Sequence, residues 1–353
     1  MKALILSGGT GTRLRPLTYT NAKQLLPLAN KPILFHIIEK VVKAGIYDIG
    51  IIVGDTREEV KKIVGNGDRW GVNISYLHQP IPLGLAHAVK TASEFLMEND
   101  FLMVLGDNVF NMDLNKLISN FYLNNANSAL LLHKVENPSQ YGVAVVEDTR
   151  IIKLVEKPKE FVSDLIITGV YIFDKSIFTA IDNIKPSPRG ELEITDAIQD
   201  QIKTGGRVTY ELIQGWWKDT GNLQDILEAN RLMLDEIDCE FKTLPRCNSV
   251  FMGKIQIGKN VNIENSIIIG PAAIADDTII TNSYIGPYTS IDKAVRANDC
   301  EIDNCIILEN TEIDGVHKRI SGSLIGRNVQ IKELHKRPLS HTLLVGDNSK
   351  IYF

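Results

Sequence analysis

A glycine-rich segment near the N-terminus has the composition of a phosphate-binding turn. Residues 6–14 read Leu-Ser-Gly-Gly-Thr-Gly-Thr-Arg-Leu. Glycines let backbone N–H groups approach a phosphate chain closely, and an arginine can pair with its charge. The segment lacks the Gly-Lys-Ser/Thr ending of the ATPase phosphate loop and the third glycine of the dinucleotide fingerprint. Taken alone, it is either a phosphate-binding turn that carries its own arginine or a plain connection between a strand and a helix.

A second cation follows ten residues after Arg13. Lys23 lies in the short segment 23–27, where a lysine is ordinarily a solvated side chain. Because it is close in sequence to the glycine-rich turn, two positive charges could converge on one polyphosphate. This spacing favours the phosphate-binding interpretation of the turn.

Buried strands alternate with amphipathic helices over the first two thirds of the chain. The strands are expected at 3–6, 49–53 and 101–105, and the helices from Lys31 to about Gly45, at 58–64 and at 86–97. This alternation predicts an α/β fold with a Rossmann-like, mostly parallel sheet covered on both faces. Ligands of such sheets bind beyond the carboxyl ends of the strands. Both the glycine-rich turn and the turn at 106–108 follow a predicted strand at such an end.

From about residue 250 the sequence repeats with a period of six. Aliphatic or small residues occupy positions 255, 261, 267, 273, 279, 285, 291 and 297. In hexapeptide repeats each unit forms one short strand and turn, and three units close one coil of a β-helix. We expect a left-handed parallel β-helix with about 18 residues per coil and roughly four or five coils. A β-sandwich would instead alternate with a period of two.

This change of pattern divides the chain into four segments. We expect a catalytic α/β domain over 1–238, a linker over 239–249, the β-helix over 250–333 and a C-terminal tail over 334–353.

Composition excludes several classes of protein. Lys plus Arg is 38 and Asp plus Glu is 43, which gives a net charge of −5, whereas binders of nucleic acid or membrane surfaces carry a basic excess. The four cysteines lack zinc-ligand spacing, so Cys300 and Cys305 are expected to be buried thiols. The apolar run at 3–6 is too short for a signal peptide, and no run reaches the roughly 20 residues of a membrane span. We expect a soluble, cytoplasmic protein.

The ordered set of short motifs resembles the sugar-phosphate nucleotidylyltransferases. The resemblance begins with residues 6–16 and 23–27 and continues, in the family's order, through 79–80, 84–86, 106–108, 141–143, 156–158, 168–169, 189–196 and 217–221. The best match is with the glucose-1-phosphate thymidylyltransferases in the long form that carries a β-helical tail. The catalytic resemblance covers residues 1 to about 235, and the repeats resemble the long form's tail.

This resemblance implies transfer of a nucleotidyl group from dTTP to glucose 1-phosphate, giving dTDP-glucose and pyrophosphate. The sugar phosphate would attack the α-phosphorus in line, with Mg²⁺ as cofactor. Its attacking oxygen is already ionised, so catalysis needs charge neutralisation and alignment of two anions rather than a general base. The implied partners are dTTP or UTP and glucose 1-phosphate, without nucleic acid or membrane, in a homo-oligomer.

The resemblance also implies roles for individual charged residues. Arg13 and Lys23 match residues that contact the phosphates of the nucleotide and the transition state. Lys157 matches the lysine that holds the sugar phosphate. Asp107 and Asp219 match two carboxylates that hold Mg²⁺, a cation that prefers oxygen ligands.

Further positions are implied to contact the base, the ribose and the sugar. Gln79 matches the glutamine that pairs with the imide edge of the pyrimidine, an edge that thymine and uracil share. The other implied nucleotide-binding residues are Leu6, Gly8, Gly9, Gly11, Thr12, Gly84 and Gly106. The other implied sugar-phosphate-binding residues are Asn108, Tyr141, Gly142, Glu156, Gly169, Glu191 and Trp217.

Three other functions stay open at this point. The enzyme could use UTP or another sugar 1-phosphate. It could be a non-catalytic regulatory subunit, although loss of a phosphate-binding cation or a metal carboxylate would be expected there, and all are present. An added acyltransferase activity in the β-helix is disfavoured because such enzymes use a histidine base, and residues 250–316 contain no histidine.

Overall fold

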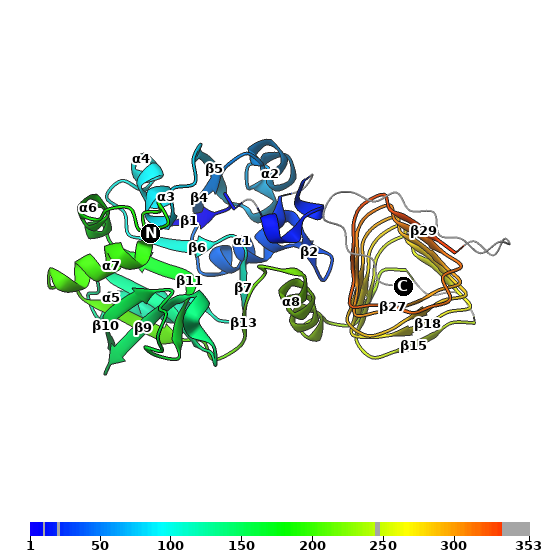
Figure 1. The fold of residues 1–353 in the computed structure, drawn as a ribbon. Helices are drawn as coiled ribbons and strands as arrows, with labels where there is room; N and C mark the ends of the chain where they lie inside the picture. The colour runs from blue at the N-terminus through cyan, green and yellow to red at the C-terminus, as the bar shows by residue number, and fades with distance from the viewer. Residues whose placement is uncertain (10, 20–21, 244–247, 334–353) are drawn as a thin grey trace. The chain divides into compact units, whose positions relative to one another are not determined.

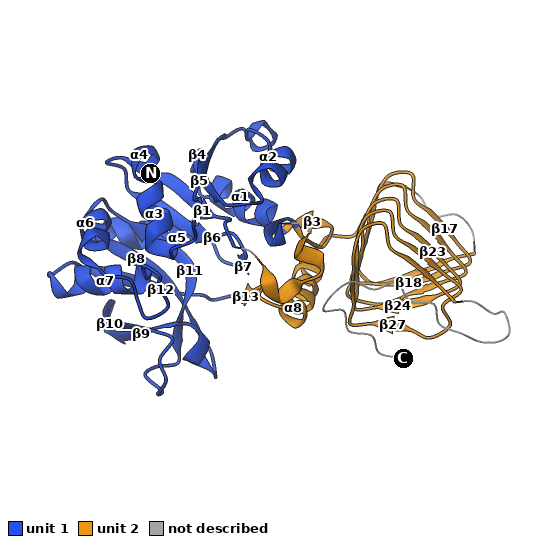
Figure 2. Cartoon of the chain, turned by 45° about the horizontal axis from the view of Figure 1, so that its top comes forward, with its two compact units in different colours: residues 1–10, 22–25, 33–217 blue, residues 11–21, 26–32, 218–353 orange. Residues whose placement is uncertain are grey.

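The computed structural model describes residues 1–9, 11–19, 22–243 and 248–333. The chain forms two compact units whose segments interleave (Figure 2). Unit 1 comprises residues 1–10, 22–25 and 33–217, and unit 2 comprises residues 11–21, 26–32 and 218–353. In the described part of the chain, no helix has the length and apolar character needed to cross a bilayer.

Among the described residues of unit 1, nine strands form one sheet, in the order β5-β4-β1-β6-β11-β8-β12-β10-β9 (Figure 1). They are β1 (Lys2–Leu6), β4 (Asp48–Val53), β5 (Asn73–His78), β6 (Phe101–Leu105), β8 (Ser128–Lys134), β9 (Gly142–Glu147), β10 (Arg150–Glu156), β11 (Leu165–Phe173) and β12 (Val208–Leu212). Strands β5, β4, β1 and β6 run parallel, and β11 joins them antiparallel to β6. The expected Rossmann-like α/β domain is confirmed. Its sheet is mixed: β12 also pairs parallel with β8, whereas β11 pairs antiparallel with β8 and β10 with β9.

Helices of unit 1 cover the sheet and complete its core. They are α1 (Ile33–Lys43), α2 (Arg57–Val64), α3 (Leu85–Thr91), α4 (Ser93–Leu96), α5 (Leu114–Leu123), α6 (Ser176–Asn183) and α7 (Ile194–Lys203). Shorter elements are η3 (Lys23–Leu25), η4 (Asp68–Trp70), η5 (Pro138–Gln140) and β7 (Asn108–Phe110). Apolar side chains of β1, β6, β8 and β11 pack with those of α3, α6 and α7 into one buried core.

Two predicted helices differ in detail. The helix expected from Lys31 begins at Ile33, because Lys31–Pro32 forms a short strand, β3, paired with β2 (Pro27–Leu28). The helix expected over 86–97 is interrupted at Ala92, where α3 ends and α4 begins.

In the described part of unit 2, short parallel strands stack into three sheets (Figure 1). One contains β14 (Glu240–Phe241), β16 (Ile255–Ile257), β19 (Ala272–Ile274), β22 (Thr289–Ile291), β25 (Ile306–Ile307) and β28 (Leu324–Ile325). The second contains β15 (Val250–Met252), β18 (Ile267–Ile269), β21 (Tyr284–Ile285), β24 (Glu301–Asp303) and β27 (Ile320–Ser321). The third contains β17 (Asn262–Glu264), β20 (Ile279–Thr281), β23 (Arg296–Asn298), β26 (Glu312–Asp314) and β29 (Gln330–Lys332). These sheets are consistent with the expected left-handed β-helix, while the expected tail at 334–353 lies outside the described residues.

The coil is shorter than a strict period of six requires. Ile267 pairs with Val250 on one side and with Tyr284 on the other, which places 17 residues in each of these coils. Consequently Ile267 and Ile279, predicted to point inward, are 43% and 36% exposed, and the adjacent Ile268 and Ile280 fill the core. The prediction was wrong at these two positions because the shorter coil moves the inward position by one residue. Each of these isoleucines is followed by another isoleucine, so the sequence pattern does not reveal the shift.

The two cysteines of the β-helix are buried, as expected. Burial raises the pKa of the Cys305 thiol to about 11 and raises that of Cys300 as well. Because the thiolate is the reactive form, both residues act as small apolar side chains of the coil interior.

A buried asparagine joins three parts of unit 2. Besides the β-helix, this unit contains η1 (Thr12–Leu14), η2 (Leu17–Tyr19), the β2–β3 hairpin and α8 (Leu223–Asp235). Asn230 of α8 is fully buried, and its Oδ1 accepts hydrogen bonds from Ala29 N at 2.8 Å and Ser290 Oγ at 2.7 Å. Its Nδ2 donates to the carbonyl oxygen of Tyr288 at 3.3 Å. The hairpin, the helix and the β-helix are therefore held at one point.

We expect Asn230→Ala to lower the free energy of unfolding by about 1–3 kcal/mol, because it leaves buried donors without an acceptor. Urea denaturation followed by circular dichroism measures this change. Gln224→Ala, an exposed position on the same helix, is the control and should leave the midpoint unchanged. Equal midpoints for both variants would contradict the role given to Asn230.

Candidate functional site

A buried lysine pairs with an aspartate at the carboxyl edge of the parallel strands. Lys23 lies on η3 with a side chain only 6% exposed, and its Nζ is 2.6 Å from Oδ2 of Asp107. Asp107 lies between β6 and β7, and its Oδ1 accepts a hydrogen bond from Asn108 Nδ2 at 2.9 Å. A lysine this buried would be costly without a counter-charge, so the pair fixes one cation and one carboxylate together.

The glycines around this pair allow two strand ends to approach closely. Gly106 N donates to the carbonyl oxygen of Leu6 at 2.8 Å, and a Cβ atom on Gly106 would lie 2.6 Å from that oxygen. A Cβ atom on Gly9 would lie 3.5 Å from Nε2 of Gln24. Gln24 is 1% exposed, and its Oε1 has no partner among the residues that the structure describes. The turn after β1 is thus faced by buried polar atoms, as a site for a polar ligand requires.

Gln79 reaches the same turn from the end of β5. A Cβ atom on Gly8 would lie 3.7 Å from its Oε1. Its Nε2 lies 2.8 Å from Nδ1 of His87 on α3. Gly84 precedes α3 with φ 99°, and a Cβ atom there would lie 2.5 Å from the carbonyl oxygen of Leu192. This glycine therefore allows the start of α3 to lie directly against residues 191–192.

A second cluster of charges forms where β10 ends and α7 begins. Arg189 Nη2 lies 2.7 Å from Glu193, 3.2 Å from Glu156 and 3.8 Å from Glu191. Lys157 Nζ is 3.9 Å from Glu156, and its side chain is 46% exposed. Two cations thus lie beside three carboxylates, and Glu156, Lys157 and Glu191 among them are positions that the sequence analysis expected to bind the sugar phosphate.

The environment of Glu156 disfavours its ionised form. Burial raises the pKa of this carboxyl and the charge of Glu193 raises it further, while Lys157, the Thr195 hydroxyl and Arg189 lower it. Thr195 Oγ1 donates to Glu156 Oε2 at 3.2 Å, and a Cβ atom on Gly142 would lie 3.2 Å from the same oxygen. Glu156 is consequently held as a hydrogen-bond acceptor in a confined position.

An aromatic group lies beside the middle of β11. Trp217, on β13 (Trp217–Asp219), donates from Nε1 to the carbonyl oxygen of Thr168 at 2.9 Å. Its ring and the ring of Tyr141 are nearly perpendicular, with centroids 5.6 Å apart. Gly169 has φ 79°, and a Cβ atom there would lie 2.6 Å from the Leu105 side chain. This packing brings β11 next to the strand that leads into Asp107.

Unit 2 contains another pair of predicted site residues. Gly11 adopts φ 60° at the start of η1, which carries Thr12 and the exposed Arg13. A Cβ atom on Gly221 would lie 3.2 Å from Arg13 Nη2 and 3.2 Å from Asp219 Oδ2. Arg13 and Asp219 therefore converge on Gly221, a position where a side chain would separate them.

The structure thus gathers the predicted residues into local groups. Lys23 lies with Asp107, Gln79 lies at Gly8, Lys157 lies with Glu156, and Arg13 lies with Asp219. The sequence analysis did not single out several contributors, among them Gln24, His87 and Arg189. Arg189 and Gln24 occur inside motifs quoted for the family resemblance, whereas His87 carries no sequence signal of its own.

The family model for nucleotidyl transferases matches residues 2–236. The chain belongs to the nucleotidyl transferase family. This nucleotidyl transferase is 45% identical to the glucose-1-phosphate thymidylyltransferase of Streptomyces antibioticus and 44% identical to that of Streptomyces griseus, with 99% of each chain covered. It also resembles the crystal structure of a UDP-glucose pyrophosphorylase complexed with UDP-glucose, with a TM-score of 0.60 and 26% identity over 67% of this chain and 99% of the other. The resemblance to the long-form family is confirmed.

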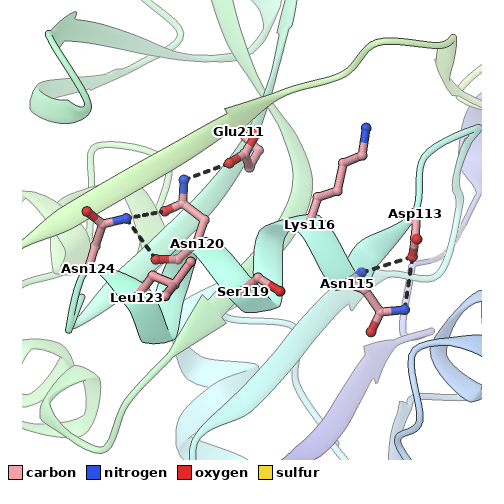
Figure 3. Close-up of a pocket in the computed structure, with 8 residues that line it drawn as sticks. All are labelled: Asp113, Asn115, Lys116, Ser119, Asn120, Leu123, Asn124 and Glu211. Carbon is pink, nitrogen blue, oxygen red and sulfur yellow. Dashed lines mark hydrogen bonds between the residues drawn. The ribbon is translucent and has the colours of Figure 1, made fainter.

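An open depression on α5 lies apart from these groups (Figure 3). It measures about 460 Å³ and contains none of the predicted site residues. Asn120 donates to Glu211 at 2.7 Å, and Asp113 accepts from the backbone N–H of Asn115 at 3.0 Å. Because these lining groups pair with one another, the depression contributes nothing to the assignment of the site.

Arg189→Met should make the protein more sensitive to alkaline pH. A carboxyl group whose pKa is higher in the folded than in the unfolded protein stabilises the fold at pH values below its ordinary pKa. This stabilisation is lost as the pH rises through the pKa that the group has in the folded protein. Arg189 lowers the pKa of Glu156, so its removal deepens this loss. Melting temperatures at about pH 5 and about pH 8 should show a larger deficit at the higher pH. Arg189→Lys keeps the charge and is the control, and a deficit independent of pH would contradict the account.

Proposed function

We propose that this nucleotidyl transferase transfers a thymidylyl group from dTTP to glucose 1-phosphate, releasing pyrophosphate. The observation that carries the proposal is the ion pair of the buried Lys23 with Asp107 beside the glycine-rich turn. The 45% identity to a glucose-1-phosphate thymidylyltransferase supports the choice of substrates. UTP is a second candidate donor. Gln79 would form hydrogen bonds with the imide edge that thymine and uracil share, and a UDP-glucose pyrophosphorylase has a similar fold.

The proposed chemistry is a direct displacement at the α-phosphorus. The sugar phosphate is an ionised nucleophile, so the protein has to overcome repulsion between two anions and align them. Arg13 and Lys23 would neutralise the triphosphate and the charge that develops in the transition state. Because the attacking phosphate oxygen is already ionised, no covalent enzyme intermediate is required.

The sugar phosphate would bind through the second cluster. Lys157 and Arg189 would hold its phosphate, and Glu156 would accept hydrogen bonds from sugar hydroxyls. The raised pKa of Glu156 is compatible with this role, since sugar hydroxyls would replace part of the hydration that burial removes. Tyr141 and Trp217 would form the apolar wall of the sugar site.

Asp107 and Asp219 have the chemistry of Mg²⁺ ligands. Mg²⁺ takes oxygen donors and is commonly held by one or two carboxylates together with substrate phosphates, so this donor set fits the ion. Asp107 has one oxygen on Lys23 and the other on Asn108, an arrangement that orients the carboxylate. Bound there, Mg²⁺ would neutralise phosphate oxygens.

Release of pyrophosphate from dTTP and glucose 1-phosphate tests the function directly. We expect turnover to dTDP-glucose, and we expect Lys23→Met to lower kcat/KM at least about 100-fold, because a cation aimed at the phosphates is lost. Lys90→Met is the matched control, since Lys90 pairs with Asp182 at 2.7 Å on the surface. Absence of turnover with every pyrimidine triphosphate and sugar phosphate tried, or full activity of Lys23→Met, would refute the proposal.

Metal dependence is tested by titrating Mg²⁺ after treatment with EDTA. Activity should disappear with the chelator and return with Mg²⁺. Asp219→Asn should raise the Mg²⁺ concentration for half-maximal activity at least about tenfold, because a charged ligand becomes neutral. Glu228→Gln alters a nearby exposed carboxylate paired with Lys218 and should leave that concentration unchanged. Activity that persists in EDTA would exclude the metal role.

A further inference from the structure

A carboxylate on α2 anchors the segment of chain that carries Lys23. The backbone N–H of Ala22 donates to Oε2 of Glu59 at 2.7 Å, and both residues belong to unit 1. The carbonyl oxygen of Ala22 accepts a hydrogen bond from Leu25 N at 2.9 Å, which closes the single turn of η3. Ala22 therefore lies where this turn begins, one residue before Lys23.

The N–H of Ala22 needs an acceptor from outside its own turn. The first N–H groups of a helical turn have no partner within it. Ala22 is 2% exposed, and a buried N–H without an acceptor is unfavourable, whereas one that donates to a carboxylate makes a strong hydrogen bond. Without the carboxylate of Glu59, the start of η3 would have to move toward water to satisfy this N–H. Lys23 would move with it.

The helix that carries Glu59 is joined at its start to the glycine-rich turn. Arg57, the first residue of α2, donates from its backbone N–H to the carbonyl oxygen of Gly54 at 3.1 Å. A Cβ atom on Gly54 would lie 3.5 Å from the carbonyl oxygen of Gly8, so the backbones of these two glycines lie close together. Val60, next to Glu59, is fully buried. The helix thus holds the Glu59 carboxylate at a set position relative to the turn.

We propose that Glu59 is a positioning residue that holds the backbone before Lys23, so that the ammonium group faces the phosphates of the bound nucleotide. This inference rests on the proposed function, because Lys23 must act on those phosphates. A cation stabilises a transition state best from a fixed position. Glu59 supplies part of that fixation from a helix that carries none of the predicted site residues.

The first test compares Glu59→Ala with Glu58→Ala by kcat/KM for dTTP at saturating glucose 1-phosphate. Both residues are acids in the first turn of α2 and favour its dipole alike, but the side chain of Glu58 is 85% exposed. Glu59→Ala should lower kcat/KM at least about tenfold, since a displacement of about 1 Å can cost a catalytic group about 100-fold. Glu58→Ala should leave it unchanged, and Glu59→Gln, which keeps an acceptor oxygen, should restore most of the activity. Wild-type kcat/KM in Glu59→Ala would overturn the inference.

A double-mutant cycle separates positioning of Lys23 from general damage to the fold. In a Lys23→Met background, Glu59→Ala should cause little further loss of kcat/KM, because the cation that Glu59 positions is absent. A further loss as large as that in the wild-type background would show that Glu59 acts through the structure at large and would overturn the inference.

Hydrogen exchange tests the contact without reliance on activity. The amide of Ala22 should exchange faster in Glu59→Ala than in Glu58→Ala, because it has lost its acceptor. Equal protection of this amide in the two variants would overturn the inference. Absence of turnover by the wild-type protein with every pyrimidine triphosphate would instead refute the proposed function, a result distinct from an active enzyme that is indifferent to Glu59→Ala.

Discussion

The ion pair between a buried lysine and a carboxylate is the constraint on which the rest of the site depends. Lys23 is 6% exposed, and its charge is balanced by Asp107 at 2.6 Å. Asp107 follows β6, whose end lies against the end of β1, and Gly106 allows this approach because a Cβ atom there would lie 2.6 Å from the carbonyl oxygen of Leu6. A preorganised cation of this kind needs no reorganisation when a phosphate arrives.

The other groups share this dependence on small residues and opposite charges. Arg189 holds together carboxylates that would otherwise repel one another, and Gly221 permits Arg13 and Asp219 to converge. In unit 2, Asn230 links the β2–β3 hairpin to the coil at Ser290 through hydrogen bonds. The β-helix therefore supports this hairpin, which follows Lys23 and precedes α1 in the sequence. This gives the β-helix a structural role, and the expected homo-oligomer stays a prediction.

The sequence predicted the features that depend on local pattern. Apolar runs located β1, β4 and β6, because a buried strand must be apolar on both faces, and the position of Asp107 after such a run indicated its place at a strand end. It did not predict contacts made by residues distant along the chain, such as His87 with Gln79 or Arg189 with Glu156. Nor could the sequence pattern show whether Ile267 or Ile268 fills the coil interior, since both are isoleucine. The 17-residue register of the coils determines that Ile268 points inward.

The central claim is that two anions held by fixed cations react with each other in one displacement, with no covalent enzyme intermediate. The stereochemical course at phosphorus tests it most directly. With the α-thio analogue of dTTP of known configuration and glucose 1-phosphate, the account predicts inversion of configuration in the α-thio nucleotide sugar formed. Retention would indicate two successive displacements through an enzyme-bound nucleotide and would contradict it.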